Sequence, residues 1–331
     1  MSDARCEPAE KAFPDERTSE FPNIVNVEVF RGACPCRCVH CPVGRTDPGK
    51  REERFGRGAI DLSLYEQIVE EIALYPWATL RLHSVGEPIL WNDLPEALRI
   101  ARRNHVRMWL FTCGVTRDSS LLETICRSAT VVEVSVNSID RQDYTDTKGV
   151  DCFDLLMRNM RIMSRCRTGT GGARLLASRT QTDDPDADRK FVEFWRDSGL
   201  VDDAFVRSYH SYNGLLDEPD ASGGVQPQPC LVHWARFNIS ASGRAIVCFN
   251  ELFKPSLDPR LVLGEVGETD IASIWTGRKL SQLRRAALSG DYGRLDFGEA
   301  LPCRECLSCQ PLFGNRETSE HQIAELDNER D

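Results

Sequence analysis

The sequence predicts an α/β protein: an open, partial barrel of parallel strands followed by a small C-terminal domain. Three observations lead to this prediction. Between residues 23 and 208, six short apolar or alternating runs are separated by five helical patterns. A segment rich in proline, glycine and acidic residues follows at 216–229, and the pattern changes after it. Cysteines crowd into two places, one directly after the first predicted strand and one towards the end of the chain.

The alternating elements come in a regular order. The predicted strands occupy residues 23–30, 79–84, 106–112, 131–136, 173–178 and 203–208. The predicted helices occupy residues 63–75, 93–104, 119–128, 153–166 and 188–198. Ser63 and Glu66 have the spacing of a capping box at the start of the first helix. Six such units are too few to close an eight-stranded barrel and suit an open one, whose chemistry lies at the carboxyl ends of the strands.

The flanking segments set the expected domain limits. We expect a disordered lead-in at 1–21, the barrel at 22–214, a linker at 215–229, the second domain at 230–313 and a mobile charged tail at 314–331. Within the second domain, residues 236–249 predict a hairpin around Ser242 and Gly243. Residues 270–288 predict one helix.

Composition narrows the class of protein. The chain has 331 residues, 41% hydrophobic and 28% charged, which fits a globular protein, and it has no apolar run of membrane-spanning length. The polar N-terminus lacks the apolar segment of a signal peptide, so we expect a cytoplasmic protein. A net charge of −10 argues against a nucleic-acid partner and is compatible with a cationic small substrate. In a reducing compartment, 14 cysteines indicate metal ligands or redox chemistry rather than disulfides.

Cys34, Cys38 and Cys41 form the first cysteine group, within the stretch RGACPCRCVHCPVGR at 31–45. A structural zinc ion takes four ligands in a closed site. A cubane of four irons held by three thiolates keeps one iron open for a substrate or cofactor. Three thiols therefore favour an iron–sulfur cluster over zinc, and we treat Cys36, two residues from each neighbour, as a spare.

The spacing CxxxCxxC in this stretch resembles the signature of the radical S-adenosylmethionine (SAM) enzymes. The resemblance implies a partial (βα)6 barrel and a [4Fe–4S] cluster whose open iron is chelated by SAM. It also implies a reductant of the flavodoxin or ferredoxin type. His40 matches the position whose ring packs near the adenine of SAM.

Further matches to this family fall after later predicted strands. VGEP at 85–88 resembles the GGEP motif, which contacts the amino group of SAM, and Ser135 matches a position that contacts its ribose or carboxylate. Arg179, with Arg174 as its competitor, matches a position that binds the carboxylate. The SAM-binding residues that the resemblance implies are His40, Gly86, Glu87, Pro88, Ser135 and Arg179.

The second cysteine group resembles the SPASM extension of this family. Cys230 and Cys248, with Gly243 between them, match its opening. A full SPASM domain binds two extra clusters, and this chain is closer to the shorter twitch form, with one auxiliary [4Fe–4S] cluster. The ligands that the resemblance implies are Cys230, Cys248, Cys303 and Cys306, with Cys309 as a spare or a replacement. A zinc ribbon is the alternative, because four cysteines that include a CxxC also suit zinc.

The resemblance implies abstraction of a hydrogen atom by a 5′-deoxyadenosyl radical. A fully ligated auxiliary cluster would then accept an electron, so we expect oxidation of a carbinol to a ketone in a sugar or aminocyclitol of antibiotic biosynthesis. The short segment before the first strand has no room for a leader-peptide domain, which favours a small substrate such as an amino sugar. His210 is the first candidate for the catalytic base.

Three other functions stay open. An epimerase or dehydratase would use Cys113, at the end of the third predicted strand, or Cys36 as a hydrogen donor. A radical SAM enzyme that modifies peptides or proteins would cleave SAM in response to a short peptide. A non-catalytic metal-binding scaffold would release no 5′-deoxyadenosine.

Overall fold

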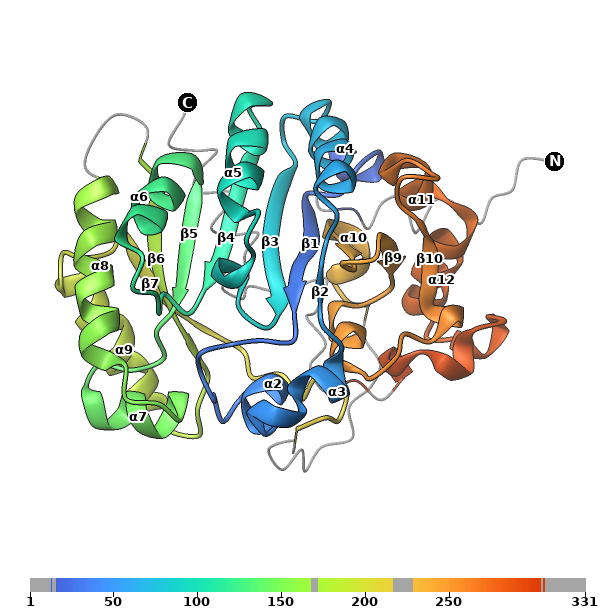
Figure 1. Cartoon of the computed structure of the whole chain (residues 1–331). Coiled ribbons are helices and arrows are strands. Elements are labelled where there is room, and N and C mark those ends of the chain that lie inside the picture. The colour runs from blue at the N-terminus through green and yellow to red at the C-terminus, as the bar shows by residue number, and fades with distance from the viewer. Residues whose placement is uncertain (1–12, 14–15, 168–171, 217–228, 305, 307–331) are drawn as a thin grey trace.

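The computed structural model describes residues 13, 16–167, 172–216, 229–304 and 306. Its centre is one ten-stranded sheet in the order β10-β9-β8-β1-β3-β4-β5-β6-β7, with the short β2 paired to β1 (Figure 1). The strands from β8 to β7 in this order pair in parallel, whereas β9 and β10 pair antiparallel.

The bounds of the elements agree with most of the predicted ones. The strands are β1 Ile24–Arg31, β2 Gly58–Ala59, β3 Thr79–Val85, β4 Arg107–Thr112, β5 Val131–Ser135, β6 Arg174–Thr180, β7 Asp203–Arg207, β8 Arg236–Ile239, β9 Arg244–Ile246 and β10 Val262–Glu265. The α-helices are α2 Pro42–Arg45, α3 Arg51–Phe55, α4 Leu62–Ala73, α5 Leu94–Arg103, α6 Ser119–Ser128, α7 Arg141–Lys148, α8 Phe153–Arg167, α9 Pro185–Asp197, α10 Val232–Ala235, α11 Ile271–Thr276 and α12 Arg278–Ser289. The 3-10 helices are η1 Glu16–Ser19, η2 Pro48–Lys50, η3 Pro88–Leu90, η4 Phe249–Phe253, η5 Pro259–Leu261, η6 Tyr292–Arg294, η7 Gly298–Ala300 and η8 Pro302–Arg304.

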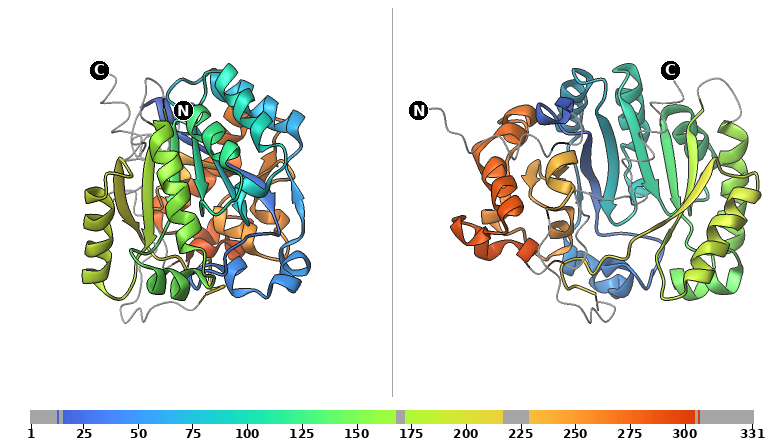
Figure 2. Two further views of the ribbon diagram at one scale, coloured as in Figure 1. Left: turned by 60° about the vertical axis from the view of Figure 1, so that its left-hand side comes forward. Right: turned by 180° about the vertical axis from the view of Figure 1, so that it is seen from behind.

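Strands β1 and β3 to β7 form the predicted open barrel. Helices α4, α5, α6, α8 and α9 cover its outer face, as the two views of Figure 2 show. The predicted strands and the predicted helices between them are all present, which confirms the fold class. The carboxyl ends of the parallel strands therefore meet at one edge of the barrel, and the loops that follow them face one another there.

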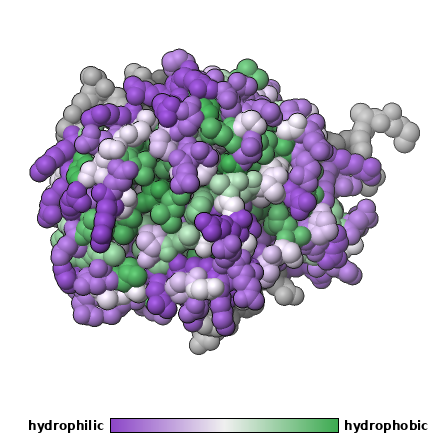
Figure 3. Space-filling model, in the orientation of Figure 1, coloured by the Kyte–Doolittle hydropathy of each residue, from purple (hydrophilic) through white to green (hydrophobic). Residues whose placement is uncertain are grey.

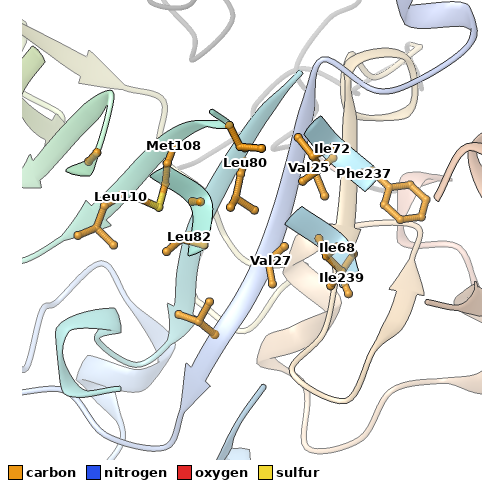
Figure 4. Close-up of a cluster of buried hydrophobic side chains, with 14 of the residues drawn as sticks. Val25, Val27, Ile68, Ile72, Leu80, Leu82, Met108, Leu110, Phe237 and Ile239 are labelled. Carbon is orange, nitrogen blue, oxygen red and sulfur yellow. The ribbon is translucent and has the colours of Figure 1, made fainter. Parts of the chain in front are cut away.

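The core has two parts because side chains alternate along a strand. Val25 and Val27 of β1 point outwards and pack against Ile68 and Ile72 of α4 (Figure 4). The first residue of β1, Ile24, belongs instead to a separate cluster inside the barrel. The members of this inner cluster are Ile24, Trp109, Val131, Leu176 and Phe205. Apolar side chains thus fill the barrel towards the amino ends of its strands, which leaves the carboxyl ends for polar chemistry.

The helix predicted at 270–288 is two helices. Residue Gly277 separates α11 from α12, with an extended backbone at φ −64° and ψ 160°. A Cβ there would lie 3.0 Å from the carbonyl oxygen of Ser273. The apolar period runs on across the break, which explains why the sequence pattern predicted one helix.

The start of α4 also differs from the prediction. Asp61, rather than Ser63, is the N-cap of this helix, and its carboxylate accepts hydrogen bonds from the backbone N–H groups of Ser63 and Leu64. Aspartate is among the preferred N-cap residues, so the helix begins two residues earlier than the capping-box spacing suggested.

Part of the predicted disordered lead-in is packed against the fold. The ring of Phe21 is buried and stacks on Tyr75 at a centroid distance of 3.9 Å. The carbonyl of Thr18, in η1, accepts a hydrogen bond of 2.8 Å from the indole of Trp275. For residues 16–21 the expectation of disorder is therefore wrong, because their apolar groups find partners in both halves of the chain. Residues 1–12 and 14–15, the linker at 217–228 and the tail at 314–331 lie outside the described residues.

The predicted hairpin at 236–249 is confirmed and joins the main sheet. β8 and β9 pair antiparallel around Gly243, which has a φ of 85°. β8 also pairs in parallel with β1, and the side chains of Asn26 and Asn238 share a buried hydrogen bond of 2.9 Å across that pair. The C-terminal region is thereby part of the same sheet as the barrel.

One face of the molecule has hydrophilic side chains around its rim and hydrophobic ones towards its centre (Figure 3). The exposed large hydrophobic residues come from separate elements: Val39, Leu74, Leu90 and Phe194. None of the helices that the structure describes is long and apolar enough to cross a membrane.

Candidate active site

Residues 34–41, here called the thiol loop, lie at the carboxyl end of β1, where the sequence placed them. Cys34, Cys38 and Cys41 are partly buried, whereas Cys36 is fully buried. The loop runs beside the end of α7: the N–H of Arg37 donates to the carbonyl of Lys148 at 2.7 Å, and that of Val39 to Thr147 at 3.0 Å. Backbone hydrogen bonds to the end of α7 therefore help to hold the thiol loop in place.

Arg51, in α3, clamps the thiol loop from the other side. Its guanidinium donates to the carbonyl oxygens of Cys34 at 2.7 Å and Cys36 at 2.9 Å, and also to Thr46 at 3.3 Å. Only 3% of Arg51 is exposed, so this positive charge lies inside the protein, directly beside the thiols. Sequence reasoning missed this residue, because the charged run KREER around it looks like a solvated helix face.

The turn after β3 approaches the thiol loop closely. The N–H of Glu87 donates to the carbonyl oxygen of Ala33 at 2.9 Å. Gly86 has a φ of 153°, and a Cβ at this position would lie 2.4 Å from the same oxygen. Only glycine fits this approach. Pro88 follows as the first residue of η3. The backbone of the GEP motif thus sits against Ala33, the residue directly before the thiol loop.

The carboxylate of Glu87 is buried and held in place. It accepts hydrogen bonds from the hydroxyl of Thr112 at 2.6 Å and from the N–H of Cys113 at 2.8 Å, both at the end of β4. Its negative charge is one of the factors that act on the nearby Cys34 thiol. A fixed carboxylate beside the thiol loop is suited to bind an ammonium group there.

Ser135, at the end of β5, shares its hydroxyl with two neighbours. Asn137 donates to it at 2.8 Å, and the buried ammonium of Lys148 lies 3.2 Å from it. The ammonium also donates to the carbonyl of Ser135. Burial lowers the pKa of Lys148, but the negative charges of Cys38, Cys36 and other thiols outweigh burial, and the net direction is upwards. Lys148 is thus a second buried cation at the thiol loop that sequence reasoning missed.

His40 and Arg179, which the resemblance implied as SAM-binding residues, differ in charge. Burial, together with the positive charges of Lys148 and Arg179, lowers the pKa of His40 to about 3, so its ring is neutral. Arg179 is 6% exposed, and its guanidinium pairs with Asp188 at 2.9 Å and with Asp143 at 3.1 Å. Because its charge is already compensated, Lys148 is better placed than Arg179 to meet a carboxylate at this end of the barrel.

Cys113 lies among the thiols of the loop. It belongs to one buried cluster with Cys36 and Val115, against which Cys34 and Cys38 pack. Hydrogen bonds from Cys113 and Cys36 lower the pKa of Cys34 to about 6, despite its burial. Cys113 and Cys36 thus lie beside Cys34 and Cys38, two of the three predicted cluster ligands.

His210 follows β7 and faces the barrel interior. Burial and the positive charges of Arg236, Arg207 and Arg81 lower its pKa to about 4, so the ring is neutral. Arg207 also forms an ion pair with the buried Glu133, which has its pKa held below its usual range although burial opposes this. The interior near His210 therefore carries more positive than negative side chains among the described residues.

The second group of cysteines, here called the auxiliary thiols, is Cys230, Cys248, Cys303 and Cys306. These thiols come from the start of the C-terminal region, the end of β9 and the segment at η8. Burial and then the charges of Cys248, Cys230 and Cys306 raise the pKa of Cys303 well above its usual range, so the four sulfurs lie near one another. The sulfur of Cys303 is also 3.9 Å from a ring nitrogen of His233. Cys309 lies outside the described residues.

The two groups of thiols differ in the number of donors that they offer. Within the described ranges, no three ligating side chains converge on one point that could hold a metal ion. A cubane differs from a single ion, because each ligand binds its own corner and the thiols stay separated by the body of the cluster. Three thiols with two buried cations at the first site, and four thiols at the second, are donor sets that fit such clusters.

The comparisons with known proteins agree on the architecture. Residues 230–310 match the SPASM family, described as an iron-sulfur cluster-binding domain. The S-adenosyl-L-methionine-dependent 2-deoxy-scyllo-inosamine dehydrogenase of Niallia circulans is 23% identical over 286 residues, which cover 86% of this chain and 92% of that protein.

Solved structures with a similar fold contain different bound molecules, as their names state. BtrN in complex with AdoMet and 2-DOIA is 17% identical, with a TM-score of 0.54 over 90% of this chain and 97% of that chain. Native anSMEcpe with bound AdoMet is 11% identical, with a TM-score of 0.61 over 93% and 97%. SuiB of Streptococcus suis bound to its precursor peptide SuiA is 14% identical, with a TM-score of 0.60 over 81% and 67%. These likenesses establish the fold.

Proposed function

We propose that this chain, which has a C-terminal SPASM region, is a radical SAM enzyme that oxidises a carbinol of a sugar or aminocyclitol to a ketone. One observation carries the proposal most directly: the curated relative that matches along 92% of its own length is an aminocyclitol dehydrogenase. The two donor sets at the thiol loop and the auxiliary thiols support it, since they would supply one cluster for SAM and one for an electron.

The thiol loop and the buried polar residues next to it would together hold SAM. Cys34, Cys38 and Cys41 would bind the first [4Fe–4S] cluster. Glu87 would pair with the amino group of SAM, and the ammonium of Lys148 beside Ser135 would pair with its carboxylate. When bound and reduced, SAM and this cluster supply a radical that abstracts hydrogen from carbon. The residues of the protein orient the cofactor and keep water away from it.

The auxiliary thiols support the second half of the reaction. Four thiolates from Cys230, Cys248, Cys303 and Cys306 would satisfy every corner of an auxiliary [4Fe–4S] cluster. A cluster without an open corner suits the acceptance of an electron rather than the binding of substrate. Hydrogen abstraction followed by electron removal is an oxidation, which distinguishes a dehydrogenase from an epimerase.

The charged side chains near His210 bear on the expected charge of the substrate. The net charge of −10 suggested a cationic amino sugar, but Arg81, Arg207 and Arg236 face this part of the interior, with Glu133 paired to one of them. Net charge summed over a surface does not describe a buried site. The net charge of the chain therefore does not indicate whether the substrate carries an ammonium group.

The setting of the reaction follows from its chemistry. A thiol-rich site that needs a reduced cluster suits the cytoplasm, with a flavodoxin or ferredoxin as the electron donor. We keep the small-molecule substrate as the proposal, while the likeness to SuiB leaves a peptide substrate as an outcome of the test.

The test is anaerobic reconstitution followed by three measurements. We expect an iron content that fits two cubanes, 5′-deoxyadenosine in the presence of an aminocyclitol, and a product two mass units lighter than the substrate. Zinc in place of iron would overturn the proposal, and so would 5′-deoxyadenosine formed only with peptides.

Epimerisation is the second candidate, and the position of Cys113 favours it. The thiol of Cys113 lies among the loop thiols at the end of β4, where it could donate hydrogen to a substrate radical. In heavy water an epimerase would give a product one mass unit heavier. Replacing Cys113 with alanine would abolish that product while SAM cleavage continued.

A further inference from the structure

His83 is a buried histidine on β3 that the proposed reaction has not yet used. It lies on the strand that leads into Glu87, four residues before it. Its ring packs edge-on against Phe249 at a centroid distance of 4.0 Å. Phe249 directly follows Cys248, one of the auxiliary thiols. His83 therefore connects the strand of the SAM motif with the segment of the second cluster.

The ring of His83 has polar atoms without partners. The residue is 6% exposed, and among the residues that the structure describes, neither Nδ1 nor Nε2 has a hydrogen-bond partner. A neutral imidazole has one N–H donor and one lone-pair acceptor. Leaving both buried and unsatisfied is unfavourable, so such atoms call for an explanation. One hydroxyl group of a polyhydroxylated substrate can donate to the unprotonated nitrogen, and a second one can accept from the N–H on the other edge of the ring.

The charge state of His83 agrees with this role. Burial, and then the positive charge of Arg81, lower its pKa well below its usual range. The ring is therefore neutral before substrate binds and has a lone pair available for a proton. A weak base is sufficient here, because the hydroxyl of an α-hydroxy carbon radical is much more acidic than that of the parent alcohol.

We propose that His83 binds the hydroxyl group of the carbinol under oxidation and accepts its proton. This inference rests on the proposed function. The carbinol loses its carbon-bound hydrogen atom to the 5′-deoxyadenosyl radical, its hydroxyl proton to a ring nitrogen of His83, and one electron to the auxiliary cluster. The carbon–oxygen bond becomes double, and atoms and electrons balance. The position of His83 between Glu87 and Cys248 suits a group that acts between the two cofactors.

His210 is less suited to this role than the sequence suggested. It faces three arginines, Arg236, Arg207 and Arg81, whereas the positive charge that acts on His83 comes from Arg81. Only its Nδ1 is both buried and without a partner among the described residues. No described ring contact joins His210 to the auxiliary segment next to Cys248, whereas His83 has one with Phe249.

The test separates binding from proton transfer. His83→Gln keeps a donor and an acceptor but cannot accept the proton. We expect it to bind the aminocyclitol within a few-fold of the wild type, and to form 5′-deoxyadenosine with roughly 10²-fold less ketone per turnover. His83→Phe removes both hydrogen bonds and should weaken substrate binding, measured without reductant, by about tenfold. His105→Asn, an exposed histidine at the other end of the barrel, is the matched control.

A measurement on the wild-type chain needs no variant. The ¹⁵N resonances of the His83 ring should shift when the aminocyclitol is added to oxidised enzyme. Full ketone formation by His83→Gln, or unchanged ring resonances, would overturn the role of His83 while the proposed function stands. If wild-type enzyme releases no 5′-deoxyadenosine with any aminocyclitol, the proposed function and this inference fall together.

Discussion

The two cysteine regions are built in different ways. The thiol loop is one continuous segment, held by Arg51 on one side and by backbone bonds to α7 on the other. The auxiliary thiols come from three segments separated in the sequence by the hairpin of β8 and β9 and by helices α11 and α12. The thiol loop is therefore prearranged by the protein, whereas a bound cluster would itself hold the auxiliary segments together.

The largest expected effect comes from removing one ligand of the thiol loop. Cys38→Ala should reduce 5′-deoxyadenosine release to the background without enzyme, because the first cluster loses one of its three thiolates. The auxiliary iron should remain, since its ligands lie elsewhere in the chain. Iron counting together with the deoxyadenosine assay checks this. Cys166→Ala, a partly buried cysteine on α8, is the control. Loss of all iron from Cys38→Ala would contradict the independence of the two regions.

Arg51→Met tests the clamp on the thiol loop. Three buried carbonyl oxygens would lose a charged donor, so we expect unfolding to become easier by about 2–4 kcal/mol, with less iron bound at the first site. Denaturant titration and iron content measure these changes. Arg54→Met, on the same helix but more exposed, should cost less than about 1 kcal/mol. Equal effects of the two substitutions would mean that the hydrogen bonds from Arg51 contribute neither to stability nor to iron binding.

Gly149→Ala tests the contact between α7 and the thiol loop. Gly149 has a φ of 63°, and a Cβ there would lie 2.7 Å from the carbonyl oxygen of Arg37. Gly199→Ala is the matched control, since its φ of 66° is similar and nothing lies within 4 Å of the added Cβ. Both substitutions should lower the free energy of unfolding by about 1 kcal/mol, because alanine disfavours a positive φ. Gly149→Ala should lower it by roughly 1–3 kcal/mol more, because of the steric clash with Arg37. Thermal unfolding decides whether the two differ.

The smallest effect is expected at the auxiliary thiols. His233→Phe removes the ring nitrogen near Cys303 and also a buried Nδ1 without a described partner. Losing the contact with Cys303 destabilises the protein, whereas removing a buried nitrogen without a described partner stabilises it. We therefore expect the free energy of unfolding to change by less than about 1 kcal/mol. The electron paramagnetic resonance signal of the auxiliary cluster should shift while that of the first cluster does not. A change at the first cluster alone would show that His233 acts at the other region.

The strands and helices of the barrel could be predicted because their signals are local. Alternating or continuous apolar runs marked the strands, and their order indicated a parallel sheet. The polar helix α7 was not predicted, because RQDYTDTK has almost no apolar period and buries little besides Tyr144 and Lys148. Its importance lies in the contact with the thiol loop, which is a tertiary feature.

The site could be predicted only where residue type and spacing carry chemistry. The thiols, Glu87 and Ser135 belong to motifs. Arg51 and Lys148 do not, since a charged residue in a polar run is usually exposed, and burial next to thiols depends on the whole fold. Arg179 shows the converse: its position matches a motif, but its guanidinium pairs with Asp188, a contact that no motif indicated.

The pairing of β8 with β1 limits how this enzyme could be rebuilt. The C-terminal region cannot be exchanged as an independent unit. Removing it by cutting the chain at residues 217–228 would take β8 away from β1, its parallel partner in the sheet. That strand would then become an edge strand with unpaired N–H and C=O groups, which promotes aggregation. A chimera with another auxiliary region would have to import a matching strand, with an amide side chain opposite Asn26.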